Sequence, residues 1–232
     1  MPEPLSPERL AELRRYTTPT VANAIETFEL RPRTAGFMSS QIRCLFPDLG
    51  AMVGYAYTAT CRANTAPPET AMALRVASWR ALEAVPAPRV MVIQDLDDPA
   101  GIGAYWGDVQ SNIHRALGCV GAVTNGSVRD LDEVHALGFH FFAGSVSVSH
   151  AYVHLVEIGI PVSVGGLTVR PGDLLHGDQH GVIAVPLEVA GRLAEGVEKV
   201  ERIERQVISY CQSPGFSRQG LEDLYRGLRL LR

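Results

Sequence analysis

Hydrophobic and polar residues alternate with a helical spacing near both ends of this chain. Residues 6–28 contain two helix starts, Ser6-Pro7 and Thr18-Pro19, in which a capping residue precedes a proline. In residues 187–232, apolar residues recur every three or four positions, which is typical of one face of an amphipathic helix. These apolar residues are Val189, Leu193, Val197, Val200 and Val207. Both regions are therefore predicted to be helical.

Between these regions, short apolar runs alternate with helical segments. Residues 90–93, 119–124 and 139–143 are predicted to be buried strands, and residues 108–117 and 131–137 are predicted to be the helices between them. A β-α-β-α-β order predicts a parallel sheet with helices on its faces.

Turn residues and shorter apolar runs define the rest of the chain. Asn125-Gly126 is predicted to turn the chain after a strand. The other predicted segments are a loop (30–50), a strand (52–60), a helix (70–84) and several short strands after residue 161. Residues 1–232 are thus predicted to form one mixed α/β domain, without an internal boundary.

Composition narrows the class of protein. The 232 residues carry a net charge of −4, so the basic surface of a nucleic-acid-binding protein is not expected. No apolar run reaches the roughly 18 residues of a membrane helix. Four widely spaced cysteines without a C-x-x-C pair predict a cytoplasmic protein without disulfides. Lys199 is the only lysine, and it falls on the polar face of a predicted helix, which disfavours Schiff-base chemistry.

Asp108 and the pair Arg129-Asp130 are predicted to lie close together. Twenty residues separate Asp108 from Arg129. A ten-residue helix runs about 15 Å in one direction, and a six-residue strand returns about 20 Å. The chain then comes back to the edge of the sheet that it left. Both groups follow parallel strands, at the edge where open α/β sheets bind ligands.

Two carboxylates and a guanidinium group at this edge fit an oxyacid substrate and a hard metal ion. Carboxylate oxygens bind Mg²⁺ or Mn²⁺, and an arginine pairs with a carboxylate or stabilises a developing enolate. A structural role also fits, with Asp108 and Asp130 as helix caps and Arg129 in a surface ion pair. The neighbouring Trp106 is either a packing residue or a wall of the pocket.

The residues around this spacing resemble a known family. Gly107-Asp108-Val109-Gln110, followed by Asn125-Gly126-Ser127-Val128-Arg129-Asp130, is similar to the D-x20-R-D signature of the RraA-like family. That family includes class II pyruvate aldolases for 4-hydroxy-4-methyl-2-oxoglutarate and 4-carboxy-4-hydroxy-2-oxoadipate. Further segments resemble the family in the same order along the chain: TPTVANA (18–24), VGYAYT (53–58), PGD (171–173) and GDQHGV (177–182).

The resemblance implies a fold, an assembly and an activity. The fold would be the RraA-like mixed αββα arrangement, related to swivelling β/β/α (phosphohistidine-type) domains. The assembly would be a homotrimer or homohexamer with sites between subunits. The activity would be a divalent-metal-dependent lyase reaction that cleaves a small 4-hydroxy-2-oxo acid to pyruvate through a metal-stabilised enolate. Oxaloacetate decarboxylation would be a side activity, because it needs the same enolate.

The resemblance also implies a role for each matching residue. Asp130 would hold the Mg²⁺ or Mn²⁺ ion, directly or through water, and Arg129 would contact the 2-oxo acid. The loop 107–110 would bind the substrate carboxylate through its backbone amides. Asp108 would orient a water molecule for proton transfer.

Some features of the chain depart from the family or leave its activity open. Aldolases of the family complete the site with a glutamate from a neighbouring subunit, for which Glu198, Glu201 and Glu204 are candidates. Asn23 and His180 stand where the family usually has aspartate. The alternative function is that of a non-catalytic, protein-binding regulator of ribonuclease E. The intact Arg129-Asp130 pair favours catalysis.

Other motifs are incomplete. Asp95-Leu96-Asp97 lacks the later ligands of a calcium loop, and Gly101-x-Gly103 lacks a correctly spaced third glycine for a dinucleotide. His150 and His154 have the spacing of one helix face, but without H-E-x-x-H they are predicted to be packed or surface histidines.

Overall fold

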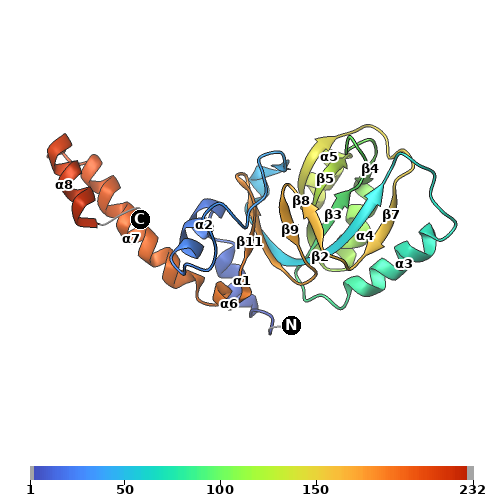
Figure 1. Cartoon of the computed structure of the whole chain (residues 1–232), viewed down its shortest axis with the longest axis horizontal. Helices are drawn as coiled ribbons and strands as arrows, with labels where there is room; N and C mark the ends of the chain where they lie inside the picture. Colours follow the sequence, from blue (N-terminus) through green and yellow to red (C-terminus); the bar gives the residue numbers. More distant parts are fainter. Residues whose placement is uncertain (1–2, 229–232) are drawn as a thin grey trace.

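Nine strands form one mixed sheet in the part of the chain that this computed structural model describes, residues 3–228 (Figure 1). The strands of the whole fold are β1 (Arg43–Cys44), β2 (Met52–Arg62), β3 (Arg89–Asp95), β4 (Ala104–Trp106), β5 (Cys119–Val128), β6 (His140–Val146), β7 (His154–Ile158), β8 (Val162–Val164), β9 (Leu167–Val169), β10 (Leu174–Asp178) and β11 (Gly181–Val185). The order in the sheet is β1-β6-β5-β3-β2-β10-β11, with β4 beside β5 and β7 beside β2. The strands β8 and β9 form a separate hairpin.

The centre of the sheet is parallel, as the sequence predicts. Strand β3 pairs in parallel with β2 and β5, and β5 pairs in parallel with β6. Antiparallel strands flank this centre, with β10 on β2 and β1 on β6. A β-carbon added at Gly177 in β10 would meet the ring of Phe142 in β6 at 2.9 Å. The sheet therefore curls, so that strands distant in its order face each other.

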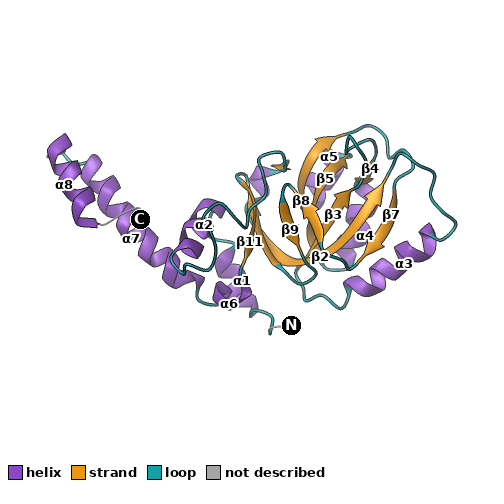
Figure 2. Ribbon diagram, in the orientation of Figure 1, coloured by secondary structure: helices purple, strands orange, loops and turns teal. Residues whose placement is uncertain are grey.

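The helices are α1 (Pro7–Leu13), α2 (Thr18–Glu26), α3 (Ala71–Leu82), α4 (Asp108–Ala116), α5 (Leu131–Leu137), α6 (Leu187–Ala190), α7 (Leu193–Cys211) and α8 (Arg218–Leu228), with a 3-10 turn at η1 (Pro47–Leu49). Helices α1 to α6 lie around the curled sheet, whereas α7 extends away from it and α8 lies beside the far end of α7 (Figure 2). Helix α4 joins β4 to β5, and α5 joins β5 to β6. Helix α2 packs against α7, β10 and β11, whereas α3 lies beside β7.

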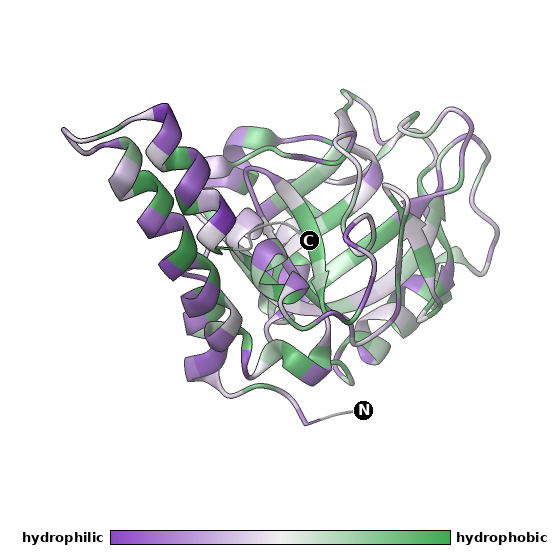
Figure 3. Ribbon diagram, turned by 60° about the vertical axis from the view of Figure 1, so that its left-hand side comes forward, coloured by the Kyte–Doolittle hydropathy of each residue, from purple (hydrophilic) through white to green (hydrophobic). Residues whose placement is uncertain are grey.

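The two faces of the sheet bury two hydrophobic clusters, because successive strand residues point to opposite sides. In β3, Met91 and Ile93 belong to the cluster beneath the helices, and Val90 and Val92 belong to the cluster that includes the β8–β9 hairpin. Figure 3 shows hydrophobic residues concentrated on the strands and a mixed pattern along α7 and α8. The parallel centre of the sheet is thus covered on both faces, as buried parallel sheets usually are.

The N-terminal helices begin close to their predicted starts. The Ser6 hydroxyl accepts a hydrogen bond from the Arg9 amide at 3.4 Å, and Thr17, one residue before the predicted start, caps α2. The Asp178 carboxylate in β10 accepts a hydrogen bond from the Thr18 amide at 2.8 Å. This bond anchors α2 to the sheet.

One predicted turn is wrong. Asn125-Gly126 lies inside β5, at a point where the register between β5 and β6 shifts. The Asn125 side chain bonds to the backbone of Asp95 in β3, accepting from its amide at 2.8 Å and donating to its carbonyl at 2.9 Å. A side-chain amide therefore replaces the backbone ladder here, and the strand continues to Val128.

One further prediction needs correction. Three helices, α6, α7 and α8, stand where one amphipathic C-terminal helix was predicted, and residues 229–232 lie outside the described part of the chain. The predicted packed or surface positions of His150 and His154 are found, because His154 is buried at the start of β7 and His150 is exposed in the preceding loop. Among the described helices, none combines the length and apolar character needed to cross a membrane.

Candidate active site

The turn between β4 and α4 meets the turn between β5 and α5. The Arg129 amide donates a hydrogen bond to the Trp106 carbonyl at 2.9 Å. The Asp108 amide donates to Oδ2 of Asp130 at 3.0 Å. The structure thus brings together the residues that the 20-residue spacing places at one edge of the sheet.

Asp130 has an unusual backbone conformation. Its φ of 56° and ψ of 49° lie in the left-handed region, which aspartate tolerates better than most residues with a side chain. Although Asp130 precedes α5, its carboxylate does not cap that helix. It reaches across to α4, and Oδ2 lies 3.4 Å from Nε of Arg129. Asp130 is therefore not the ordinary helix cap of the structural alternative.

Gly107 makes room for this carboxylate. A β-carbon at residue 107 would overlap Oδ2 of Asp130 and lie 3.1 Å from Cγ of Arg129. The φ of Gly107 is −161°, which any residue can adopt, so close approach explains the glycine here. Gly107, the first residue of the predicted loop 107–110, thus leaves the space that the Arg129 and Asp130 side chains occupy.

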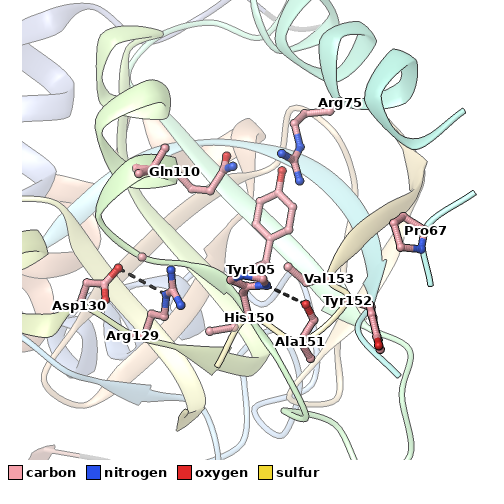
Figure 4. A pocket seen from close by; sticks show the side chains of 13 residues that line it. Pro67, Arg75, Tyr105, Gln110, Arg129, Asp130, His150, Ala151, Tyr152 and Val153 are labelled. Carbon is pink, nitrogen blue, oxygen red and sulfur yellow. Dashed lines mark hydrogen bonds and ion pairs between the residues drawn. The ribbon is translucent and has the colours of Figure 1, made fainter. Parts of the chain in front are cut away.

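A cavity of about 360 Å³ opens beside these turns (Figure 4). It is lined by Pro67, Arg75, Ala104, Tyr105, Gly107, Val109, Gln110, Arg129, Asp130, His150, Ala151, Tyr152 and Val153. Arg129 and Asp130 lie toward one end, and Arg75 lies toward the other. Of the predicted site residues, Gly107, Val109, Gln110, Arg129 and Asp130 contribute to this wall.

Asp108 takes part in the site through its backbone. It is not among the residues that line the cavity. Its carboxylate accepts a hydrogen bond from Nδ2 of Asn112, one turn further along α4, at 2.7 Å. The role of this carboxylate in proton transfer stays a prediction.

Sequence reasoning missed the opposite wall of the cavity. Arg75 enters from α3, while His150 and Tyr152 come from the loop before β7. A signal for Arg75 is present in the sequence, because residues 75, 78 and 82 are helical neighbours. Ser78 and Leu82 are buried, which places a charged residue on the inward face of α3.

Trp106 is a packing residue and not a wall of the cavity. It is fully buried against His114, with ring centroids 4.8 Å apart.

Burial fixes the protonation of two groups near the cavity. Burial lowers the pKa of His114 to about 4, and this ring is neutral at pH 7. Burial also raises the pKa of Tyr105 above its ordinary value, so its hydroxyl keeps its proton.

The family model described as "RraA-like: Aldolase/RraA" matches residues 18–184, which include both turns and all the residues that line the cavity. The chain belongs to the RraA-like family.

Two relatives of this RraA-like chain are similar over shorter segments. An uncharacterized protein of Methanocaldococcus jannaschii is 31% identical over 105 residues, which are 45% of this chain and 50% of that protein. A protein of Halalkalibacterium halodurans named "Putative 4-hydroxy-4-methyl-2-oxoglutarate aldolase" is 36% identical over 84 residues, which are 36% of this chain and 40% of that protein. The alignments thus span half or less of both relatives.

Solved structures show the same RraA-like fold. An uncharacterized protein of Pseudomonas syringae pv. tomato has a TM-score of 0.73 and 23% identity, covering 97% of this chain and 96% of its own. Streptomyces coelicolor RraAS2, described as an unusual member of the RNase ES inhibitor RraA protein family, has a TM-score of 0.66 and 23% identity. That comparison covers 90% of this chain and 98% of RraAS2. At these identities the likeness concerns the fold alone.

A class II aldolase would need a divalent metal, and the Asp130 carboxylate is the acidic group in the described cavity wall that could hold one. Among residues 3–228, no three His, Cys, Asp or Glu side chains form a metal-binding group. Mg²⁺, however, usually keeps several waters and uses one or two carboxylates together with substrate oxygens. Oδ2 of Asp130 is bonded to Arg129 and Asp108, while no described residue hydrogen-bonds its Oδ1. This oxygen lies on a partly exposed carboxylate in the cavity wall.

The three glutamates considered for a neighbouring subunit's contribution lie on α7, away from α4 in the same chain (Figure 1). Glu204 accepts a hydrogen bond from Asn23 at 3.3 Å, and Glu201 pairs with Arg205 at 3.2 Å. Neither these two residues nor Glu198 lines the cavity. Within one chain, none of the three glutamates therefore contributes to the cavity.

Proposed function

We propose that this chain is a divalent-metal-dependent lyase that cleaves a 4-hydroxy-2-oxo acid and releases pyruvate, with oxaloacetate decarboxylation as a side activity. The observation that carries this proposal is the bond between the two turns. The Asp108 amide holds Oδ2 of Asp130, and Arg129 lies beside the same oxygen at the wall of a cavity sized for a small acid. The aldolase-named relative, matched over part of its length, supports the same reaction class.

Arg129 binds and orients the 2-oxo acid in this proposal. Its Nε is directed to Asp130, so the outer nitrogens of the guanidinium remain for the substrate's carboxylate and 2-oxo oxygen. The first amides of α4 add partial positive charge at the same place. These donors stabilise the negative charge that develops on the 2-oxo oxygen when the C3–C4 bond breaks.

Asp130 holds the metal ion, which supplies Lewis-acid polarisation of the 2-oxo group when bound. The reaction itself moves one proton. The C4 hydroxyl loses its proton, the C3–C4 electron pair passes to C3 as an enolate, and C4 leaves as a carbonyl compound. Protonation at C3 then gives pyruvate, so atoms and charge balance without an oxidant or reductant.

Asp108 assists proton transfer in this proposal. Its carboxylate lies at the first turn of α4 and orients the water that carries the proton between the C4 hydroxyl and C3. Asn112 holds this carboxylate through Oδ1, and Asn112 also donates to the Asp108 carbonyl at 3.0 Å. The bond to Asn112 fixes the side chain close to the loop that binds the substrate.

The test is pyruvate release from oxaloacetate and from 4-hydroxy-4-methyl-2-oxoglutarate, with Mg²⁺ or Mn²⁺ and with chelator. Arg129→Ala is expected to lower kcat/KM about 100- to 1,000-fold. Asp130→Ala is expected to abolish the metal-dependent release of pyruvate. Arg192→Ala is the matched control and should retain wild-type rates, because Arg192 lies just before α7, in a cation–π contact with Phe28 and outside the cavity wall. If no metal supports release from either acid, the lyase proposal is wrong and a non-catalytic binding role becomes the better account.

A further inference from the structure

The reaction proposed above gives no role to His150, which lies in the cavity wall. This residue belongs to the loop between β6 and β7, and its side chain is exposed. Figure 4 shows its imidazole between Arg129 and the carbonyl of Ala151. The chain thus places an imidazole ring in the same cavity as the residues proposed to bind the 2-oxo acid.

The fold commits one ring nitrogen of His150. Nδ1 lies 2.7 Å from the Ala151 carbonyl, which can only accept a hydrogen bond, so Nδ1 carries the proton of the neutral ring. Nε2 is then the unprotonated nitrogen, and no described residue hydrogen-bonds it. Two other histidines, His135 and His180, each bond to a carboxylate. Among the described residues His150 has no such partner, so its Nε2 is available to a ligand in the cavity.

The loop that carries His150 is held in a costly conformation. Ala151 has a φ of 45°, in the left-handed region that residues with a β-carbon rarely adopt. The Ala151 amide donates to the Ser149 hydroxyl at 2.9 Å, and the Ala104 amide donates to the Ser149 carbonyl at 2.9 Å. Strained residues that surrounding bonds hold in place cluster at functional sites. Here the strain and the bonds fix the carbonyl that orients the His150 ring.

Gly103 lets this loop approach the site closely. A β-carbon added there would lie 2.9 Å from the β-carbon of Ala151 and 2.8 Å from that of Ala63. The Ala63 carbonyl also accepts a hydrogen bond from the Tyr152 amide at 3.1 Å. Contacts with two other segments therefore set the position of His150, and the glycine that failed to fit a dinucleotide motif has a structural reason.

The other titratable side chains of the described cavity wall are poorly suited to exchange a proton at neutral pH. Arg75 and Arg129 carry guanidinium groups, which stay charged, and Asp130 is assigned to the metal ion. Tyr105 and Tyr152 are phenols, a class of group that keeps its proton at neutral pH. Burial raises the pKa of Tyr105 further, and Arg75 hydrogen-bonds it. Imidazole is the side chain that both accepts and donates a proton in this range.

We propose that His150 is the base that takes the proton from the C4 hydroxyl of the substrate, which makes it a catalytic residue. As the C3–C4 bond breaks, this proton passes to Nε2, the hydroxyl oxygen becomes a carbonyl oxygen, and the C3–C4 electron pair forms the enolate. The imidazolium then returns the proton to C3 through the water that Asp108 orients, and the neutral ring is regenerated. This assignment rests on the lyase function proposed above.

Two substrates that give the same enolate test this role. Cleavage of 4-hydroxy-4-methyl-2-oxoglutarate removes a proton from the C4 hydroxyl, whereas oxaloacetate loses a C4 carboxylate that is already ionised. Glutamine is polar and of similar size to histidine, but it does not take up a proton at neutral pH. His150→Gln is expected to lower kcat for aldol cleavage about 100-fold or more, and to change kcat for decarboxylation by less than about threefold.

His135→Gln is the matched control. His135 bonds to Asp48 and does not line the cavity. This variant should retain wild-type rates for both substrates. Aldol cleavage in His150→Gln within about threefold of the wild type would overturn the assignment, because loss of a general base costs about 100-fold or more. An equal loss for both substrates would also overturn it, since a binding or folding defect does not distinguish the two reactions.

Chemical rescue separates proton transfer from a structural role. In His150→Ala, imidazole added to the solution is expected to restore aldol cleavage in proportion to its concentration, because His150 is exposed and its removal leaves room for a free base. Loss of cleavage that imidazole does not restore would assign His150 a structural role and overturn the proposal.

The two proposals fail in different ways. Metal-dependent pyruvate release from both acids that is indifferent to His150 would reject the base and leave the lyase standing. A metal-loaded wild type that releases pyruvate from neither acid would reject the lyase, and with it the role given to His150.

Discussion

The backbone amide of Asp108 lies 3.0 Å from Oδ2 of Asp130 and donates a hydrogen bond to it. This bond joins the start of α4 to the start of α5, two points separated by 22 positions in the sequence. It also fixes Oδ2 of the Asp130 carboxylate, while no described residue hydrogen-bonds Oδ1. A site that depends on this contact should respond to small changes at either turn.

Gly107→Ala is the smallest such change. Its β-carbon would overlap the Asp130 carboxylate, so we expect this variant to displace Asp130 and lose pyruvate release. The overlap should cost about 1–3 kcal/mol in the free energy of unfolding. Gly215→Ala is the control, because a β-carbon there meets nothing within 4 Å. Wild-type activity in Gly107→Ala would show that the position of Asp130 is not critical.

The left-handed conformation of Asp130 predicts a difference between two inactive variants. Asp130→Ala and Asp130→Gly both remove the carboxylate, but alanine keeps a β-carbon at a φ of 56° whereas glycine does not. We therefore expect Asp130→Gly to be more stable than Asp130→Ala by about 1 kcal/mol. Urea denaturation of both proteins measures this difference. An equally or more stable alanine variant would mean that the site stores no backbone strain.

Asp108→Asn separates the charge of Asp108 from its backbone bond. Asparagine keeps both the amide that holds Asp130 and an oxygen that accepts from Asn112. If the carboxylate takes part in proton transfer, kcat should fall about 100-fold or more while the metal affinity is retained. A kcat within about threefold of the wild type would assign Asp108 a role through its backbone only.

Buried histidines predict loss of stability in acid. The pKa of His114 is about 4 in the folded protein, compared with 6.5 as its ordinary value. Between these pH values the unfolded chain binds more protons, so the free energy of unfolding falls as the pH drops from 6.5 toward 4. The contribution of His114 should approach roughly 3 kcal/mol, and His140, with a pKa also lowered to about 4, should add to it.

His114→Phe removes this titration and keeps a ring against Trp106. Denaturation at pH 7 and pH 5 should show a smaller decrease for His114→Phe than for the wild type. A variant at the exposed His150 serves as the comparison. An unchanged pH dependence in His114→Phe would show that burial of His114 does not govern acid stability.

The sequence was sufficient to place one half of the site. Helix and strand lengths bring Asp108 and Arg129-Asp130 to one edge because both turns belong to consecutive β-α units, whose geometry is local. Arg75 could not be placed in the same way. Its approach to Tyr105 depends on how α3 packs over the sheet, which no spacing within one unit determines.

The predicted turn at Asn125-Gly126 failed for a related reason. Local preference favours a turn for this pair. In the structure the Asn125 amide bonds to both backbone groups of Asp95 on a neighbouring strand, and this tertiary contact keeps β5 extended. The hydrogen bonds that decide the local structure here join two different strands, so a prediction from the residues of one strand could not include them.

Enolate formation at the Arg129-Asp130 site is the central claim, and the exchange of the methyl protons of pyruvate tests it most directly. In D₂O, an enzyme that forms the enolate replaces these protons with deuterium, and proton NMR follows the loss of the methyl signal without any knowledge of the groups on C4. We predict exchange with Mg²⁺ or Mn²⁺, none above background with chelator, and none in Asp130→Ala. Exchange that is absent from the metal-loaded wild type, or undiminished in Asp130→Ala, would contradict the account.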